Sequence, residues 1–151
     1  METEKRWISS EVLFSAICEQ LAEGRQAAFT VTGMSMWPFL RHGADTVVLE
    51  QAEPDQIRKG DIVLVRVNPG RYLLHRVTAC TENQVETTGD GNCFRDGFFQ
   101  RDQVLARAVK LIRSDRTIDC ADLRWKLAFR CWMVLYPIRR PMMSIWKRIR
   151  K

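Results

Sequence analysis

Apolar and polar positions follow two different periods along the chain, and the change of period marks its organisation. Near the amino terminus, Leu13, Ile17 and Leu21 recur every four residues with charged side chains between them. This spacing predicts an amphipathic helix over residues 7–24. From Ala27 onward the apolar positions fall into short runs separated by turn residues, a pattern that is typical of β-strands.

Six of these short runs predict strands. The turns between them are rich in Gly, Asp, Asn and Pro, as in Asn68-Pro69-Gly70. The strands are expected near residues 27–32, 45–50, 61–67, 72–78, 84–88 and 104–112. Because no helical pattern separates them, they predict a mainly β protein, either a compact antiparallel barrel or a folded sheet.

A helical period returns after residue 119. Asp122 is placed to cap a helix that continues to about Tyr136. Pro137 and Pro141 predict an interruption, with a last short helix starting at Pro141. The pattern therefore divides the chain into an amino-terminal helix packed on the body, a β domain and a helical tail, at residues 1–26, 27–118 and 119–151.

Charge separates the tail from the rest of the chain. The net charge is +6, yet nine Lys and Arg and no acidic residue follow Asp122, while the preceding residues hold 15 basic and 18 acidic side chains. A mildly acidic body argues against nucleic acid as its ligand. The basic tail leaves an anionic membrane surface or an acidic protein as its partner.

The tail has two interpretations that the sequence leaves open. Five of its residues are Trp, Tyr or Phe, and such rings most often pack in a core, which predicts a cap over one side of the sheet. Alternatively, Met142, Ile145, Trp146 and Ile149 share one helical face opposite basic residues, a pattern that favours anchoring at a membrane surface.

The remaining composition indicates a cytoplasmic protein, in peripheral contact with the inner membrane face if the tail binds lipid. The longest uncharged apolar run, at residues 131–138, has eight residues, against about 20 for a spanning helix. The charged amino terminus does not resemble a signal peptide. Five cysteines without a Cys-x-x-Cys pair favour a reducing compartment, and with two histidines they predict neither a metal nor another cofactor.

Candidate chemistry begins at Gly-Met-Ser-Met-Trp-Pro, residues 33–38. Gly33 allows a backbone shape that other residues rarely adopt, and Pro38 restricts the turn that follows Ser35. This turn can present the Ser35 hydroxyl together with the backbone N–H groups of Ser35 and Met34. Such donors are suited to stabilising an oxyanion. Taken alone, however, the motif also fits a loop serine without a role.

A base and an acid follow at some distance from the serine. His75 ends the apolar run of a predicted strand, where a histidine is usually a core residue but can also be a general base. Asp90 and Asp96 lie in a turn-rich loop, and either could orient the imidazole. A serine, a histidine and an aspartate together are the parts of an acyl-transfer site.

The order of these motifs resembles the S24/S26 serine peptidases, the superfamily of type I signal peptidases and LexA-like self-cleaving repressors. The resemblance covers roughly residues 28–112. It rests on Gly-x-Ser-Met-x-Pro, on the strand start Gly60-Asp61-Ile62-Val63, on His75-Arg76-Val77, and on Gly89-Asp90-Gly91-Asn92 followed by Asp96. With a histidine and no lysine at the base position, the chain is similar to the archaeal and endoplasmic-reticulum signal peptidases. It also resembles short S24/S26-type proteins of Bacteroides-like bacteria, which carry a similar basic tail.

This resemblance implies a LexA/signal-peptidase-like coiled antiparallel β barrel and a specific set of roles. Ser35 would be the nucleophile, His75 the general base and Asp96 the orienting acid, with Gly33, Met34 and Asp90 supporting the site. A peptide or protein substrate would lie extended beside the serine. The residues implied to contact it are Ala28, Phe29, Val31, Thr32, Met36, Leu73 and Leu74.

A second hypothesis is a protein of the same fold that has no catalytic activity. The same sheet could hold a peptide without cutting it, as a binding module whose helix and basic tail dock a partner or a membrane surface. The two hypotheses differ in whether Ser35 is required for function.

Overall fold

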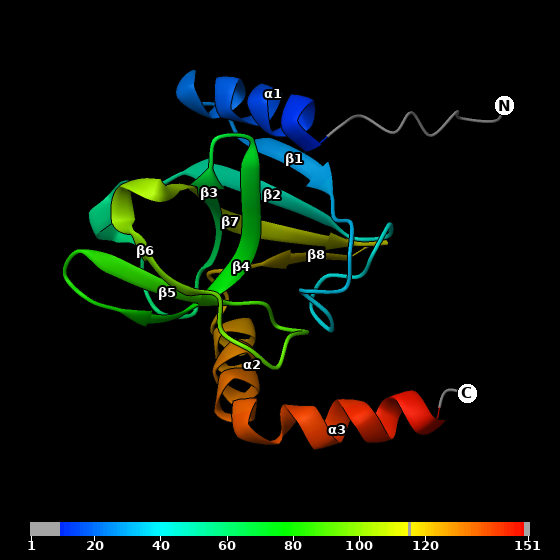
Figure 1. The fold of residues 1–151 in the computed structure, drawn as a ribbon. Coiled ribbons are helices and arrows are strands. Elements are labelled where there is room, and N and C mark those ends of the chain that lie inside the picture. The colour runs from blue at the N-terminus through cyan, green and yellow to red at the C-terminus, as the bar shows by residue number, and fades with distance from the viewer. Residues whose placement is uncertain (1–9, 115, 150–151) are drawn as a thin grey trace, which may run out of the picture.

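The protein is built on an eight-stranded antiparallel sheet accompanied by three helices (Figure 1). This computed structural model describes residues 10–114 and 116–149. The strands are β1 (Ala27–Thr30), β2 (Thr46–Gln51), β3 (Ile62–Asn68), β4 (Arg71–Cys80), β5 (Gln84–Thr88), β6 (Gly97–Gln100), β7 (Val104–Arg113) and β8 (Arg116–Asp119). The prediction of a mainly β, antiparallel protein is confirmed.

The strands pair in the order β1-β2-β7-β3-β4-β5-β6, and β8 pairs with β7 beyond the end of β3. No pairing joins β1 to β6 within the described residues, so the sheet is open there. All six predicted strands are present, within two residues of their expected ends. Two short strands, β6 and β8, were not predicted. Strand β6 starts at Gly97 in the preceding turn, and β8 has a single apolar residue, Ile118, so neither shows the pattern of a strand.

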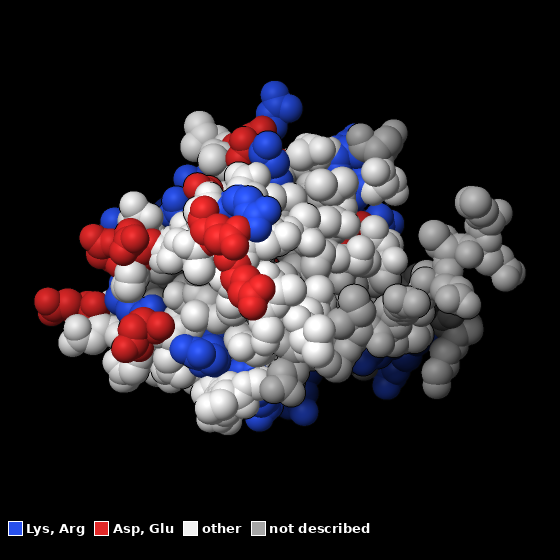
Figure 2. All heavy atoms as spheres, turned by 90° about the horizontal axis from the view of Figure 1, so that it is seen from above, with Lys and Arg blue, Asp and Glu red and all other residues white. Residues whose placement is uncertain are grey.

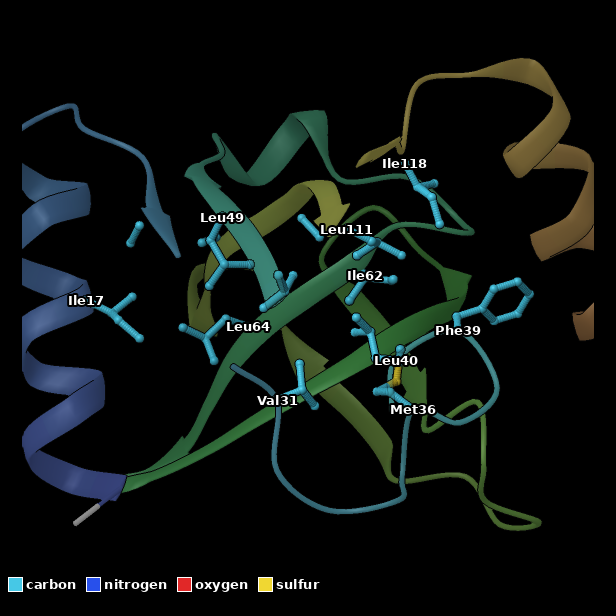
Figure 3. Packing of buried hydrophobic residues seen from close by; sticks show 14 of the residues in the cluster. Ile17, Val31, Met36, Phe39, Leu40, Leu49, Ile62, Leu64, Leu111 and Ile118 are labelled. Carbon is cyan, nitrogen blue, oxygen red and sulfur yellow. The ribbon is translucent and has the colours of Figure 1, made fainter. Parts of the chain in front are cut away.

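The sheet curls so that its two faces bury two apolar clusters. In β3 the alternation is visible directly: Ile62 and Leu64 belong to the larger cluster, and Val63 and Val65 to the smaller one. All four side chains are buried, because both faces of this central strand are covered. Figure 3 shows the larger cluster, in which side chains from the sheet meet Ile17 from the first helix.

Helix α1 (Ser10–Ala22) covers one end of the sheet beside β1 and β2 (Figure 1). Ile17 and Leu21 are its buried anchors, which confirms the predicted amphipathic helix. Positions 7–9 of that prediction lie outside the described residues. The helix ends at Ala22, two residues before Gly24, which has a positive φ of 77°.

The two tail helices differ in how far their apolar side chains are buried. In α2 (Leu123–Val134), the Asp122 side chain accepts a hydrogen bond from the Arg124 N–H, and Phe129 is buried against the body. In α3 (Tyr136–Ile149), by contrast, large apolar side chains remain exposed, among them Ile145 and Ile149. Thus α2 packs on the sheet while α3 keeps an uncovered apolar face.

The predicted start of the last helix at Pro141 was wrong. Helix α3 begins at Tyr136 and runs through both prolines. Pro137 is tolerated because it lies in the first turn, where backbone N–H groups have no partner inside the helix. Pro141 lies inside the helix and removes one backbone donor, but the helix continues to Ile149. None of the helices described is long and apolar enough to cross a membrane.

Candidate active site

Ser35 lies in the segment between β1 and β2, here called the serine loop (residues 31–45). Backbone hydrogen bonds close its base: Val31 N–H donates to the Asp45 carbonyl oxygen at 2.9 Å, and Gly43 N–H donates to the Val31 carbonyl oxygen at 2.8 Å. Met36, 1% exposed, directly follows Ser35 and anchors the loop in the core. The loop therefore holds the half-buried Ser35 between a buried and an exposed neighbour.

Gly33 has a positive φ of 87°, as its position before Ser35 led us to expect. Its N–H donates to Nδ1 of His42 at 2.6 Å. His42 is exposed, and this hydrogen bond makes it part of the turn. Because the Gly33 donor is already used, it contributes to the site by shaping the backbone.

An ion pair reinforces the base of the serine loop. The buried carboxylate of Asp45 accepts a hydrogen bond from Arg41 N–H at 2.8 Å and an ion pair from Arg41 Nη2 at 2.8 Å. Burial alone would raise the pKa of Asp45, but the hydrogen bonds and charge of Arg41, with the charge of Arg113, outweigh it and lower the pKa. Asp45 therefore stays ionised at neutral pH and keeps the loop closed.

The glycine-rich turn after β5, here called the acidic loop (residues 89–96), packs against the backbone of the serine loop. Gly91 N–H donates to the Ser35 carbonyl oxygen at 2.8 Å. A Cβ placed on Gly89 would lie 2.6 Å from that same oxygen. A Cβ on Gly91 would collide with the Met34 carbonyl oxygen. Both glycines are thus required by the close approach of the two loops, which fixes the position of the Ser35 backbone.

His75 and Asp96 are in direct contact. His75 lies in the middle of β4 and is 5% exposed; its Nδ1 is 2.5 Å from Oδ2 of Asp96. Thr87 Oγ1 donates to the same carboxylate oxygen at 2.7 Å. With Nδ1 bound to Asp96, the remaining nitrogen, Nε2, is the one available to a hydroxyl group. Thr87 was not predicted; its only signal in the sequence is its place in the strand before the acidic loop.

Asp90 has a different partner. It forms a buried, two-pronged ion pair with Arg76, with Nε–Oδ1 at 2.8 Å and Nη2–Oδ2 at 2.7 Å. Arg76 Nη1 donates to the Gly60 carbonyl oxygen at 2.7 Å, and its guanidinium carbon lies 3.9 Å from the ring centroid of Phe129. His75 and Arg76 are neighbours in β4, and their side chains point to opposite faces of the sheet. His75 therefore contacts Asp96, whereas Arg76 pairs with Asp90. Asp90 supports the acidic loop without touching the imidazole.

Ser35 and His75 share the wall of one groove, a cavity of about 400 Å³ that we call the serine groove. Six of the seven residues expected to contact a peptide line it; Ala28 does not, since it faces away from its neighbour Phe29 along β1. Two further lining residues, Phe14 and Gly70, were not predicted from the sequence. The lining residues are Phe14, Phe29, Val31, Thr32, Ser35, Met36, Gly70, Arg71, Tyr72, Leu73, Leu74 and His75.

Two backbone donors at the serine have no acceptor among residues 10–114 and 116–149. Within the described residues, the N–H groups of Met34 and Ser35 donate to no protein acceptor. No hydrogen bond joins Ser35 Oγ to His75 in that part of the chain either. The site thus combines a formed His75–Asp96 pair, a serine on the same groove and two open donors beside it.

In residues 10–114 and 116–149, no group of three or more His, Cys, Asp or Glu side chains could hold a metal ion.

Comparison with models of known protein families, and with the sequences of curated proteins, finds no match to this chain.

Proposed function

We propose that this protein is a serine endopeptidase of the S24/S26 type, with a LexA/signal-peptidase-like coiled sheet. The observation that carries the proposal is the 2.5 Å contact between His75 and Asp96 on a groove that also contains Ser35. A histidine oriented by a buried carboxylate is the partner that a serine nucleophile needs. The substrate is a peptide or a leader-like segment of a protein.

The proposed reaction proceeds in two halves. Ser35 Oγ attacks the scissile carbonyl carbon while His75 Nε2 takes the hydroxyl proton, and the N–H groups of Ser35 and Met34 stabilise the oxyanion. His75 then gives the proton to the leaving amine, which leaves an acyl group on Ser35. Water, deprotonated by the same imidazole, hydrolyses the ester and releases the second product. Asp96 holds Nδ1 throughout and stabilises the imidazolium.

Two unpaired strand edges favour an extended substrate. Strand β1 pairs with β2 on one side only, within the described residues. The first half of β4, Arg71 to His75, pairs with β3, whereas β5 begins to pair at Arg76. Both free edges adjoin the serine groove, so a peptide can add to either one as a further strand. Phe29, Val31 and Leu74 then offer apolar contacts to alternate side chains.

A serine-reactive fluorophosphonate probe tests this proposal. The wild-type protein is expected to be labelled stoichiometrically, because a His75-activated Ser35 hydroxyl attacks phosphorus as it attacks a carbonyl. Ser35→Ala should abolish labelling. Ser15→Ala, which removes an exposed hydroxyl of α1, should leave it unchanged. A folded wild-type protein that binds peptides in the groove but resists the probe would instead support a catalytically silent binding module.

We also propose that α3 makes peripheral contact with an anionic membrane surface. Ile138, Met142, Ile145 and Ile149 follow a spacing of four, three and four residues, and all are exposed. Basic residues flank this stripe, and neither α2 nor α3 contains an acid. Figure 2 looks onto the opposite, α1 side, where acidic and basic side chains are interspersed. An apolar stripe with only basic charges around it suits anionic headgroups.

Substitution of the stripe should weaken vesicle binding. In co-sedimentation with phosphatidylglycerol vesicles, Ile145→Glu with Ile149→Glu is expected to lower the partition coefficient by about tenfold or more, because two apolar anchors are lost and two repelled charges gained. Phe98→Glu provides the control, since it changes an exposed apolar residue of β6. Equal pelleting of both variants would argue against the membrane proposal.

A further inference from the structure

A second cavity of about 400 Å³, distinct from the serine groove, lies where the tail helices meet β4 and β5. Four cationic side chains line it: Lys59, Arg95, Arg130 and Arg139. No Asp or Glu is among its described lining residues, although Tyr136 and two threonines add hydroxyl groups. We call it the basic cavity. It shares no lining residue with the serine groove.

Arg139 differs from the other cationic residues of the basic cavity because it is buried and incompletely hydrogen-bonded. It is 1% exposed, and its Nη2 donates to the Trp132 carbonyl oxygen at 2.9 Å. Its Nε and Nη1 are buried and have no hydrogen-bond partner in the described chain. Burial lowers the pKa of Arg139, and the charge of Arg76 adds to this effect. A buried, incompletely bonded guanidinium is costly unless a further partner satisfies it.

Two carboxylates near the basic cavity already have partners. Asp90 favours the charged form of Arg139 but gives both of its oxygens to Arg76. Glu86 lies 3.6 Å from Nε of Arg95 and also accepts a hydrogen bond from Thr78 Oγ1 at 3.0 Å. Both carboxylates thus already have partners, and neither lines the basic cavity. Four cationic side chains around one cavity favour binding of an anion.

We propose that the basic cavity binds a phosphate group, either as a free phosphate or as the headgroup of a phospholipid. A phosphate monoester carries close to two negative charges near neutral pH and offers three acceptor oxygens, so it neutralises more of this cluster than a carboxylate does. Guanidinium groups match its oxygens with paired donors. This site is independent of the proposed peptidase chemistry.

The free-phosphate source is tested by titration with inorganic phosphate at constant ionic strength, read by thermal unfolding and calorimetry. Phosphate should raise the unfolding temperature saturably, because it binds the folded state. Arg130 is exposed, so Arg130→Gln should fold, and it is expected to weaken phosphate binding by about fivefold to tenfold. Arg124→Gln removes the same charge from α2 outside the cavity and should bind as the wild type does.

The lipid source is tested by co-sedimentation with vesicles of phosphatidic acid in phosphatidylcholine. Binding that Arg130→Gln weakens, but Arg124→Gln does not, assigns the phosphate to a lipid if inorganic phosphate fails to compete. Saturable, Arg130-dependent binding of inorganic phosphate assigns it to a free ligand. If neither probe distinguishes Arg130→Gln from Arg124→Gln, the proposal is wrong, whatever the outcome with serine-reactive probes.

Discussion

Replacing His75 with alanine should lower the rate constant for peptide hydrolysis by roughly 10⁴-fold to 10⁶-fold, and Ser35→Ala should cost about as much. The reason is that a serine hydroxyl is a poor nucleophile without a base to take its proton. Asp96→Asn should cost about 10⁴-fold, because the amide can stabilise the wrong tautomer of the imidazole. The measurement is kcat/KM on a peptide selected from a library with the wild-type protein.

His42 provides a matched control, as it is the only other histidine of the chain. His42→Asn keeps an acceptor for the Gly33 N–H and should retain activity within about tenfold. The double variant of Ser35 and His75 should be no slower than either single one, because the members of a triad act as a unit. A fully active His75→Ala protein would show that the base is another group.

Asp90→Ala is expected to lower the free energy of unfolding by about 3–5 kcal/mol. Arg76 and Asp90 have side chains that are 0% and 1% exposed, so removing the carboxylate leaves a buried cation without its ion pair. The loss would also disturb the acidic loop that contacts the Ser35 carbonyl oxygen through Gly91. Urea unfolding monitored by tryptophan fluorescence measures the effect.

Asp102→Ala is the control, because Asp102 is exposed in the short turn before β7; its free energy of unfolding should change by less than about 0.5 kcal/mol. Replacing both partners, as Arg76→Met with Asp90→Leu, should recover part of the loss, since a buried ion pair exchanged for apolar groups is often neutral. A single Asp90→Ala substitution without measurable effect would show that the pair contributes nothing to stability.

The strands were predictable because each carries local signals: a run of apolar residues and a turn after it. Strands β6 and β8 lack these signals, because β6 starts at Gly97 in the preceding turn and β8 has a single apolar residue, Ile118. The start of α3 was missed because Pro141 was treated as a helix start rather than an interior residue. Whether a helix tolerates a proline at this position depends on the whole helix, and a rule based on neighbouring residues does not include that.

The residues of the candidate site could be named from the sequence, but the resemblance, and not the local pattern, pointed to Asp96 as the partner of His75. Nothing local distinguishes Asp90 from Asp96, since both lie in the same turn-rich loop. Their assignment follows from the alternation of His75 and Arg76, and Arg76 was not recognised as a partner. Phe14 was missed for a similar reason: it reaches the serine groove because α1 packs against β1, which tertiary structure alone determines.

The most direct test of the central claim is to identify the residue that reacts with the fluorophosphonate probe in the wild-type protein. Peptide mapping by mass spectrometry should place the adduct on Ser35 alone, and His75→Ala should greatly slow its formation. Labelling on another serine, or labelling of Ser35 at an unchanged rate without His75, would contradict a Ser35–His75–Asp96 mechanism.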